Sequence, residues 1–163
     1  MNNRSTEERI IALLKENKYV ISAAESCTGG LFLATLINVS GASEVIKEGF
    51  ITYAEEAKQT RLGVKRETLA TYTAVSEQTA REMAEGLQAV TGADVAVSIT
   101  GLAGPGGGTE EIPVGTVFVG CFCKERVTVR RLQLEGSRLE IRQAAVEEAL
   151  LFVEQCIRNV IFF

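Results

Sequence analysis

Apolar positions along the chain follow two different periods. A helical spacing of three and four residues runs through 5–17, from Ser76 to Gly92, and again after Ser137. In the first and last of these segments a serine precedes a glutamate by three residues, which is the spacing of a capping box. Five short stretches are expected to form strands, namely 19–25, 44–53, 93–100, 114–123 and 126–134. The interleaving of the two periods predicts an α/β protein.

Two shorter helices are expected between these elements. The segment LFLATLINVS, residues 31–40, has the length and apolar content of a buried helix that ends near Gly41. Thr52 and Glu55 are spaced to cap a short helix, and Gly63 is placed to end it with a left-handed residue. The strand before each short helix should therefore end in a tight turn at the edge of the sheet.

The last two strands favour an antiparallel hairpin, because they alternate with period two and are separated only by Lys124 and Glu125. With the preceding strand–helix units, this predicts a mixed sheet with helices on both faces. The chain has 163 residues, of which 46% are apolar and 23% charged, as in a globular protein. That length has room for one ordinary domain, so residues 1–163 are expected to share a single core.

Charge and hydropathy limit the expected partners. The 17 basic and 21 acidic residues give a net charge of −4 and are mixed along the chain, so no nucleic-acid partner is expected. No segment reaches the roughly 18 uninterrupted apolar residues that a membrane span needs. The N-terminal segment is charged and helix-periodic, unlike a secretory signal. A cytoplasmic protein without a membrane partner is therefore expected.

The four cysteines show neither CxxC spacing nor histidine companions, because the chain contains no histidine. A structural zinc site and a disulfide framework are therefore not expected. Cys121, Cys123 and Cys156 are expected to be small core residues, since free cysteine is commonly buried.

Two loops built of small residues follow predicted strands. One is ESCTGG, residues 25–30, and the other is the glycine-rich segment GLAGPGGGTEEIP, residues 101–113. Ligands of open α/β sheets bind outside the carboxyl ends of the strands, so a shared cleft is expected there. The second loop matches neither a Walker motif nor GxGxxG. It is either a flexible connector or a set of backbone amides that holds a phosphate or an oxyanion.

Ser26 and Cys27 are adjacent candidate nucleophiles in the first loop. Ser26 is alternatively a cap for the helix that is expected to begin near Thr28. A thiolate at a helix N-terminus is a competitor, although thiol hydrolases generally pair cysteine with histidine. The absence of histidine excludes a Ser-His-Asp triad and leaves lysine, tyrosine or a carboxylate as the base.

Lys58 is the best-placed candidate base. It lies on the short helix after the second strand, five residues beyond Tyr53, on the expected side of the sheet. A lysine titrates near about 10.4, so it must be desolvated to act as a base near neutrality. The alternative is a solvated Lys58 that pairs with Glu55 at i, i+3 spacing.

Several long motifs agree with one known family. In order along the chain they are AAESCTGG, GFITYAEEAK followed by LGV, AVSE, and VSITGLAGPGGGTEEIPVGTV. Together they resemble the C-terminal domain of the competence/damage-inducible CinA proteins, and through it the nicotinamide-nucleotide amidohydrolases, over residues 5–155. The resemblance implies a three-layer α/β/α sandwich with a mixed, mostly parallel sheet in the stand-alone form of the domain. It also implies no metal, no organic cofactor and a homo-oligomer, dimeric or larger.

The resemblance further implies hydrolysis of the carboxamide of nicotinamide mononucleotide to nicotinate mononucleotide and ammonia. Ser26 takes the place of the family's nucleophile, Lys58 of its base and Tyr53 of its tyrosine, which either relays the proton or orients the lysine. The residues expected to contact substrate are Glu25, Cys27, Thr28, Gly29, Gly30, Thr100, Gly101, Ala103 and Gly104, with Arg142 as a charge clamp for the phosphate. The alternatives are a nucleotide-binding or regulatory module without hydrolysis, and an interaction domain of the recombination machinery.

Overall fold

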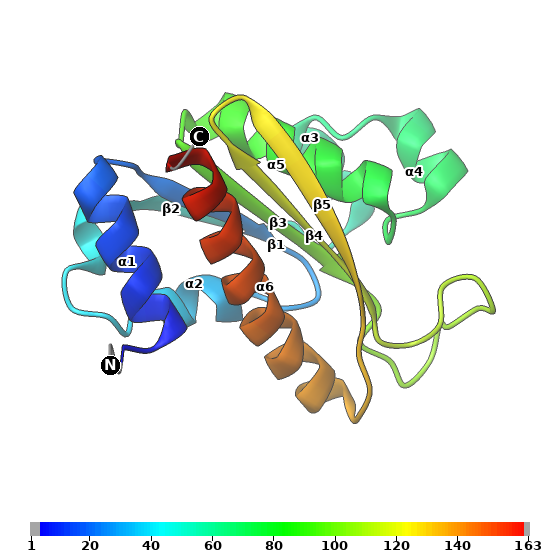
Figure 1. Ribbon diagram of the computed structural model, residues 1–163. Coiled ribbons are helices and arrows are strands. Elements are labelled where there is room, and N and C mark those ends of the chain that lie inside the picture. Colours follow the sequence, from blue (N-terminus) through cyan, green and yellow to red (C-terminus); the bar gives the residue numbers. More distant parts are fainter. Residues whose placement is uncertain (1–3, 162–163) are drawn as a thin grey trace.

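The computed structural model describes residues 4–161, which form one five-stranded mixed sheet covered by helices on both faces (Figure 1). The strands lie in the order β2 (Ile46–Ile51), β1 (Ile21–Glu25), β3 (Val95–Gly101), β4 (Thr116–Cys123) and β5 (Arg126–Gln133). β1 pairs in parallel with β2 and β3, whereas β4 is antiparallel to β3 and β5. Four strands thus run in one direction and only β4 is reversed, which confirms the mixed, mostly parallel sheet.

Three layers are formed because each face of the sheet carries its own apolar cluster. On one face, α1 (Thr6–Asn17), α2 (Leu31–Leu36) and α6 (Arg138–Ile161) cover the larger cluster. On the other, α3 (Glu55–Leu62), α4 (Arg66–Tyr72) and α5 (Glu77–Thr91) cover a smaller one. A short 3-10 helix, η1 (Ala42–Glu44), leads into β2. The α/β/α sandwich is therefore confirmed.

Most expected helix starts are confirmed by their caps. Ser5 accepts from the N–H of Glu8 while the Glu8 carboxylate accepts from the N–H of Ser5, and Ser137 and Glu140 make the same reciprocal pair. Ser76 caps α5 by accepting from the backbone N–H of Thr79. These local polar signals fix where the three long helices begin.

Three local expectations were wrong. Thr52 does not cap α3, whose N-cap is Ala54; the Thr52 hydroxyl is buried without a partner in the described chain. Helix α2 is shorter than expected, because the β-branched and polar residues 37–40 continue as turns. Helix α4 was not predicted, since it buries only Thr68 and Leu69 and has no apolar periodicity.

A close contact between α5 and the end of α3 gives a stability prediction. A Cβ added at Gly86 would overlap the backbone carbonyl of Leu62. Replacement of a helical glycine by alanine normally stabilises by about 1 kcal/mol. Here Gly86→Ala should instead lower the free energy of unfolding by about 2–3 kcal/mol, because the two helices must separate. Urea denaturation measures this loss. In the control Gly106→Ala the new methyl enters open space, so a change below about 0.5 kcal/mol is expected.

Candidate active site

The carboxyl ends of β1, β2 and β3 bring three segments of the chain together. Glu25 at the end of β1 is in register with Ile51 of β2 and Ile99 of β3. The turn after β1, the start of α3 and the loop after β3 therefore meet around a cavity of about 190 Å³. Its walls are formed by Ser26, Cys27, Tyr53, Lys58, Ala74, Val75, Thr100, Gly101, Leu102, Ala103 and Arg138. The expected shared cleft is present.

Lys58 and Ser26 contact each other at the closed end of this cavity. The Lys58 Nζ lies 3.0 Å from Ser26 Oγ, 2.7 Å from the carbonyl oxygen of Thr52 and 3.2 Å from that of Tyr53. A neutral amine satisfies all three contacts by donating its two hydrogens to the carbonyls and accepting the Ser26 hydroxyl proton with its lone pair. The geometry therefore suits an amine that removes a proton from serine.

Burial favours that neutral form. Lys58 is only 1% exposed, and none of its hydrogen-bond partners in the described chain is a carboxylate. Desolvation lowers the pKa of Lys58 below its ordinary value of 10.5, while Cys27 and Glu55 oppose the shift. A solvated pair between Lys58 and Glu55 is therefore not the arrangement observed.

Cys27 is a poor competitor for the same role. Its side chain is 6% exposed, and burial raises the pKa of its thiol to about 11, although nearby Lys58 and Arg142 act in the other direction. The reactive thiolate is accordingly scarce near neutral pH. Of the two adjacent candidates, only Ser26 has the Lys58 amine within hydrogen-bond distance of its side chain.

Ser26 does not cap the following helix, contrary to the alternative expected from sequence. Helix α2 begins at Leu31, and the buried Glu25 carboxylate accepts the N–H groups of Phe32 at 2.8 Å and Leu33 at 3.2 Å. An acidic group at a helix N-terminus supplies the acceptors that the first turn lacks. Glu25 thus holds the helix and does not line the cavity, which leaves the Ser26 hydroxyl free for Lys58.

The turn from Ser26 to Gly30 is held by its backbone. The Ser26 N–H donates to Ile99 O at 2.9 Å and the Gly29 N–H to Ser26 O at 3.1 Å. Gly29 and Gly30 have φ values of 60° and 101°, which side chains disfavour. Within residues 4–161 the N–H groups of Cys27 and Thr28 have no acceptor. These two amides are therefore available to an oxyanion formed beside Ser26.

Arg142 contacts this turn from outside. Its Nε donates to the Cys27 carbonyl at 2.9 Å and its Nη2 to the Thr28 carbonyl at 3.1 Å. These two charge-assisted hydrogen bonds tie the turn to α6. Arg142 does not line the cavity, and the structure gives it the role of bracing the turn.

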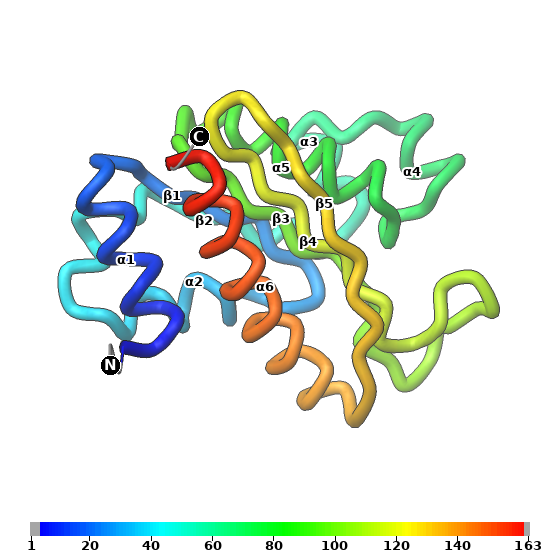
Figure 2. The backbone as a smooth tube through the Cα atoms, viewed as in Figure 1, coloured from blue at the N-terminus to red at the C-terminus, as the bar shows by residue number. Residues whose placement is uncertain are grey.

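The loop after β3 forms the opposite wall. Thr100 Oγ1 donates to the Ala74 carbonyl at 2.7 Å, which joins this strand end to the segment before α5. A Cβ at Gly101 would lie 2.7 Å from Val117 and 3.1 Å from the Cys27 sulfur, so glycine permits the close approach. Ala103 lines the cavity, and beyond it residues 104–113 extend away from the sheet near the start of α6 (Figure 2).

Arg138 was missed by sequence reasoning, although it lines the cavity. It is the first residue of α6 and carries no motif that separates it from other surface arginines. Its Nη1 donates to the Gly104 carbonyl at 2.6 Å and its Nη2 to the Tyr53 hydroxyl at 3.0 Å. The only available signal was its position one helical turn before Arg142.

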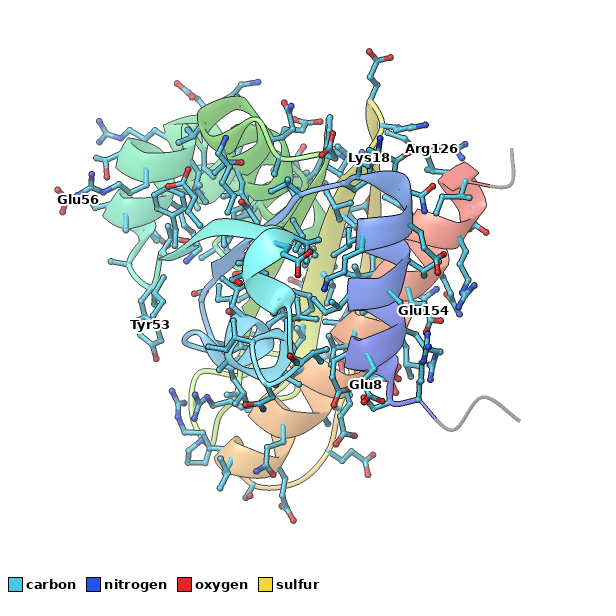
Figure 3. The ribbon with its side chains drawn as sticks, turned by 90° about the vertical axis from the view of Figure 1, so that its left-hand side faces the viewer. Glu8, Lys18, Tyr53, Glu56, Arg126 and Glu154 are labelled. Carbon is cyan, nitrogen blue, oxygen red and sulfur yellow. The ribbon has the colours of Figure 1, made fainter. Side chains whose placement is uncertain are left out.

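The Tyr53 side chain lies at the rim. It is 61% exposed and points outward (Figure 3), and its hydroxyl meets Arg138 rather than Ser26 or Lys58. The backbone carbonyl of Tyr53, in contrast, accepts from Lys58. In this structure Tyr53 thus contacts Lys58 only through its main chain, and its side chain contacts Arg138.

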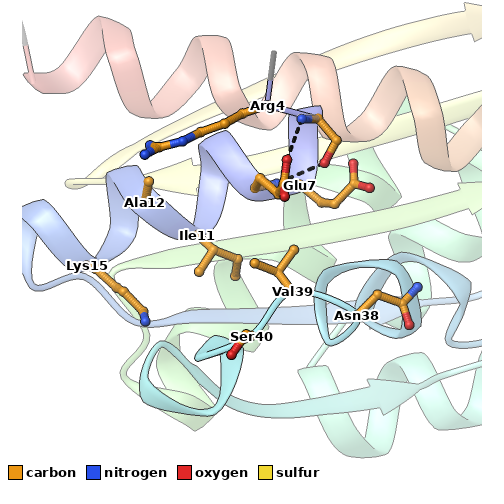
Figure 4. Close-up of a pocket in the computed structure, with 10 residues that line it drawn as sticks. Arg4, Glu7, Ile11, Ala12, Lys15, Asn38, Val39 and Ser40 are labelled. Carbon is orange, nitrogen blue, oxygen red and sulfur yellow. Dashed lines mark hydrogen bonds between the residues drawn. The ribbon is translucent and has the colours of Figure 1, made fainter. Parts of the chain in front are cut away.

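A wider cavity, of about 460 Å³, lies between α1 and the turn after α2 (Figure 4). Several of its polar side chains are paired, as in the Ser5–Glu8 capping box and the Lys15–Glu44 ion pair at 3.0 Å. No buried nucleophile or base faces it among the described residues, so it lacks the features of a catalytic site.

A serine hydroxyl thus lies within hydrogen-bond distance of a buried lysine amine at the carboxyl ends of parallel strands. The chain belongs to the CinA C-terminal domain family, whose model matches residues 3–157. A CinA-like protein of Kosmotoga olearia is 48% identical over 157 residues, 96% of this chain and 38% of that protein. A CinA-like protein of Thermotoga neapolitana is 48% identical over 150 residues, 92% of this chain and 36% of that protein.

Solved structures agree with this assignment. The crystal structure of the competence/damage inducible protein CihA from Agrobacterium tumefaciens has a TM-score of 0.90 at 41% identity, covering 94% of this chain and 93% of that one. A competence-damaged protein (CinA) superfamily protein from Enterobacter cloacae has a TM-score of 0.89 at 30% identity, covering 96% and 98%. The chain spans about two fifths of the length of the curated relatives that it matches.

Within residues 4–161, no helix is both long and apolar enough to cross a membrane. In the same part of the chain, no three His, Cys, Asp or Glu side chains are grouped so as to hold a metal ion.

The Ser26–Lys58 contact predicts how the reactivity of Ser26 changes with pH. Labelling of Ser26 by a fluorophosphonate should become faster as pH rises through the lowered pKa of Lys58, with a plateau below pH 10.5, because the neutral amine is the active form. Lys58→Met should slow labelling by about 100-fold or more. Lys47→Met is the matched control and should have no effect, since that amine binds the Thr91 carbonyl. Equal labelling of Lys58→Met, or labelling on Cys27, would contradict the contact's role.

Proposed function

We propose that this chain hydrolyses the carboxamide of nicotinamide mononucleotide to nicotinate mononucleotide and ammonia. The proposal rests on one observation above all, the 3.0 Å contact between the buried Lys58 amine and Ser26 Oγ. The family resemblance of the motifs that carry both residues supports the substrate. Amide hydrolysis needs a strong nucleophile and a group that protonates the departing amine, and one lysine serves both steps.

The reaction begins with attack of Ser26 Oγ on the carboxamide carbon while its proton passes to Lys58 Nζ. The oxygen that becomes negative accepts hydrogen bonds from the Cys27 and Thr28 amides, which are unpaired in the described chain. The Lys58 ammonium then donates its proton to the leaving nitrogen, which departs as ammonia and leaves an acyl ester on Ser26. The positive charge on Lys58 is short-lived, as its desolvated site requires.

Water completes the cycle by the same chemistry. Neutral Lys58 removes a proton from a water molecule, whose oxygen attacks the ester, and the returning proton restores Ser26. The net change is one amide and one water converted to one carboxylic acid and one ammonia. Arg142 keeps the amides in place throughout by holding the carbonyls of Cys27 and Thr28. No step uses a metal or an organic cofactor.

The substrate phosphate is assigned to Arg138 and the backbone amides of the loop after β3. Both guanidinium groups make two hydrogen bonds to neighbouring residues, but Arg138 lines the cavity and Arg142 does not. Guanidinium groups bind phosphate through paired, charge-assisted hydrogen bonds. This assignment replaces Arg142 with Arg138 as the charge clamp.

Ammonia release from nicotinamide mononucleotide tests the proposal. Wild type and Cys27→Ala should be active in the presence of EDTA, while Ser26→Ala and Lys58→Met should lose about 10³-fold or more in kcat. Full activity of Ser26→Ala would contradict the serine mechanism, and loss of wild-type activity in EDTA would contradict the metal-free one. If the wild type binds the nucleotide without releasing ammonia, the chain is a nucleotide-binding module and not an amidase.

The phosphate assignment has a separate test. Arg138→Gln should raise KM for nicotinamide mononucleotide by about 10- to 100-fold, because a charged hydrogen bond contributes about 1.5–3 kcal/mol. Hydrolysis of nicotinamide riboside, which lacks the phosphate, should change little. Arg66→Gln is the matched control, since Arg66 also opens a helix but does not line the cavity. An equal loss with both substrates would show that Arg138 only supports the rim.

A further inference from the structure

Three of the four cysteines gather at the other end of the sheet from Ser26. Cys121 and Cys123 occupy alternate positions of β4 on the face that α6 covers, and Cys123 is in register with Val95 at the start of β3. Cys156, on α6, packs against the apolar cluster that contains both of them. A cavity of about 150 Å³, separate from the catalytic one, is lined by all three. The three thiols therefore form a cluster with its own access to solvent.

The three thiols differ in exposure. Cys121 and Cys123 are 1% and 2% exposed, whereas Cys156 is partly exposed. Arg126 and Arg130 also line this cavity. The Arg130 guanidinium lies 4.4 Å from the centre of the Phe152 ring, one turn before Cys156, and donates to Gln155 at 2.8 Å. A fixed positive charge thus lies beside the one thiol of the cluster that solvent reaches.

Cys121 and Cys156 also interact with each other. The interaction with Cys121 lowers the pKa of Cys156, with help from Arg130 and against desolvation. The interaction with Cys156, together with burial, raises the pKa of Cys121 well above its ordinary value. The pair is therefore asymmetric: Cys156 favours the thiolate, and Cys121 is the protonated partner behind it.

We propose that Cys156 is an oxidant-sensitive thiol and that Cys121 is its resolving partner, so that peroxide closes a disulfide between α6 and β4. The Cys156 thiolate attacks one oxygen of hydrogen peroxide, which gives a sulfenic acid and hydroxide. The Cys121 thiol then attacks the sulfenic sulfur and displaces its hydroxyl group as water, while the hydroxide from the first step takes up the proton released by Cys156. Two thiols and one peroxide become one disulfide and two water molecules, so the atoms and electrons balance.

The thiols of Cys123 and Cys27 differ from that of Cys156 and serve as comparisons within the same chain. Burial raises the pKa of Cys123 and of Cys27 to about 11, so neither offers much thiolate. Cys123 lies two residues from Cys121 on the same strand face, and Cys27 lies at the catalytic cavity. The disulfide would tie the helix that begins with Arg138 to the central sheet.

Peptide mapping of the whole chain tests this proposal. The reduced protein is treated with hydrogen peroxide, alkylated and digested with trypsin without reduction. The wild type should lose two hydrogen atoms in mass and yield a cross-link between peptides 82–124 and 143–158, which dithiothreitol reverses. Fragmentation of the cross-linked pair distinguishes Cys121 from Cys123, because Phe122 separates them. This readout needs no variant to fold.

Variants then assign the two roles. Cys156→Ser should abolish the cross-link, and Cys121→Ser should leave a sulfenic acid on Cys156 that dimedone traps. Cys123→Ser and Cys27→Ser are the matched controls and should retain the cross-link. A cross-link through Cys123 or Cys27 would overturn the assignment of partners. Oxidation of Cys156 without any intramolecular cross-link would overturn the disulfide itself.

Discussion

The cavity at the carboxyl ends of β1, β2 and β3 depends on one buried amine that has no carboxylate among its hydrogen-bond partners in residues 4–161. Lys58 is enclosed, and its nitrogen meets two carbonyl oxygens and Ser26 Oγ. Desolvation penalises the ammonium, so folding favours the neutral amine. Between the lowered pKa and 10.5 the unfolded chain binds more protons at this lysine, so its effect on stability becomes more favourable as pH rises. The burial that lowers the pKa of Lys58 therefore costs stability near neutral pH.

The rest of the fold keeps that arrangement in place. Because β1 pairs in parallel with β2 and β3, the carboxyl ends of the three strands lie side by side. The Ser26 turn, which follows β1, therefore lies next to the start of α3, which follows β2. The Ser26 N–H is fixed on Ile99, and Arg142 reaches across from α6 to the carbonyls on the outer side of the turn. These contacts hold the turn and the start of α3 around the Ser26–Lys58 pair.

The sequence predicted the parts of this structure that depend on local physics. Apolar periodicity and capping boxes located the strands and the long helices, because those signals lie within a few residues of each other. The lack of histidine directed attention to Lys58, whose burial and contact with Ser26 are confirmed. The prediction that Thr52 caps α3 was wrong, since the spacing of a motif does not reveal whether the hydroxyl can reach the helix.

Other features required the three-dimensional arrangement. Arg138 and Arg142 are one turn apart on the same helix, yet only the packing of α6 against two loops determines which meets the cavity and which braces the turn. Glu25 was expected to contact substrate, but the entry angle of α2 makes its carboxylate the acceptor for that helix. Such roles depend on contacts between residues distant in sequence, which periodicity cannot report.

The protonation of Lys58 is most directly measured by NMR titration of the protein labelled with 13C at the lysine ε-carbons. The Lys58 signal is assigned by its loss in Lys58→Met. The account predicts that this signal titrates clearly below the value of about 10.4 expected for an exposed lysine. A Lys58 signal that titrates at or above that value would contradict the account, because the amine would then be charged when Ser26 has to lose its proton.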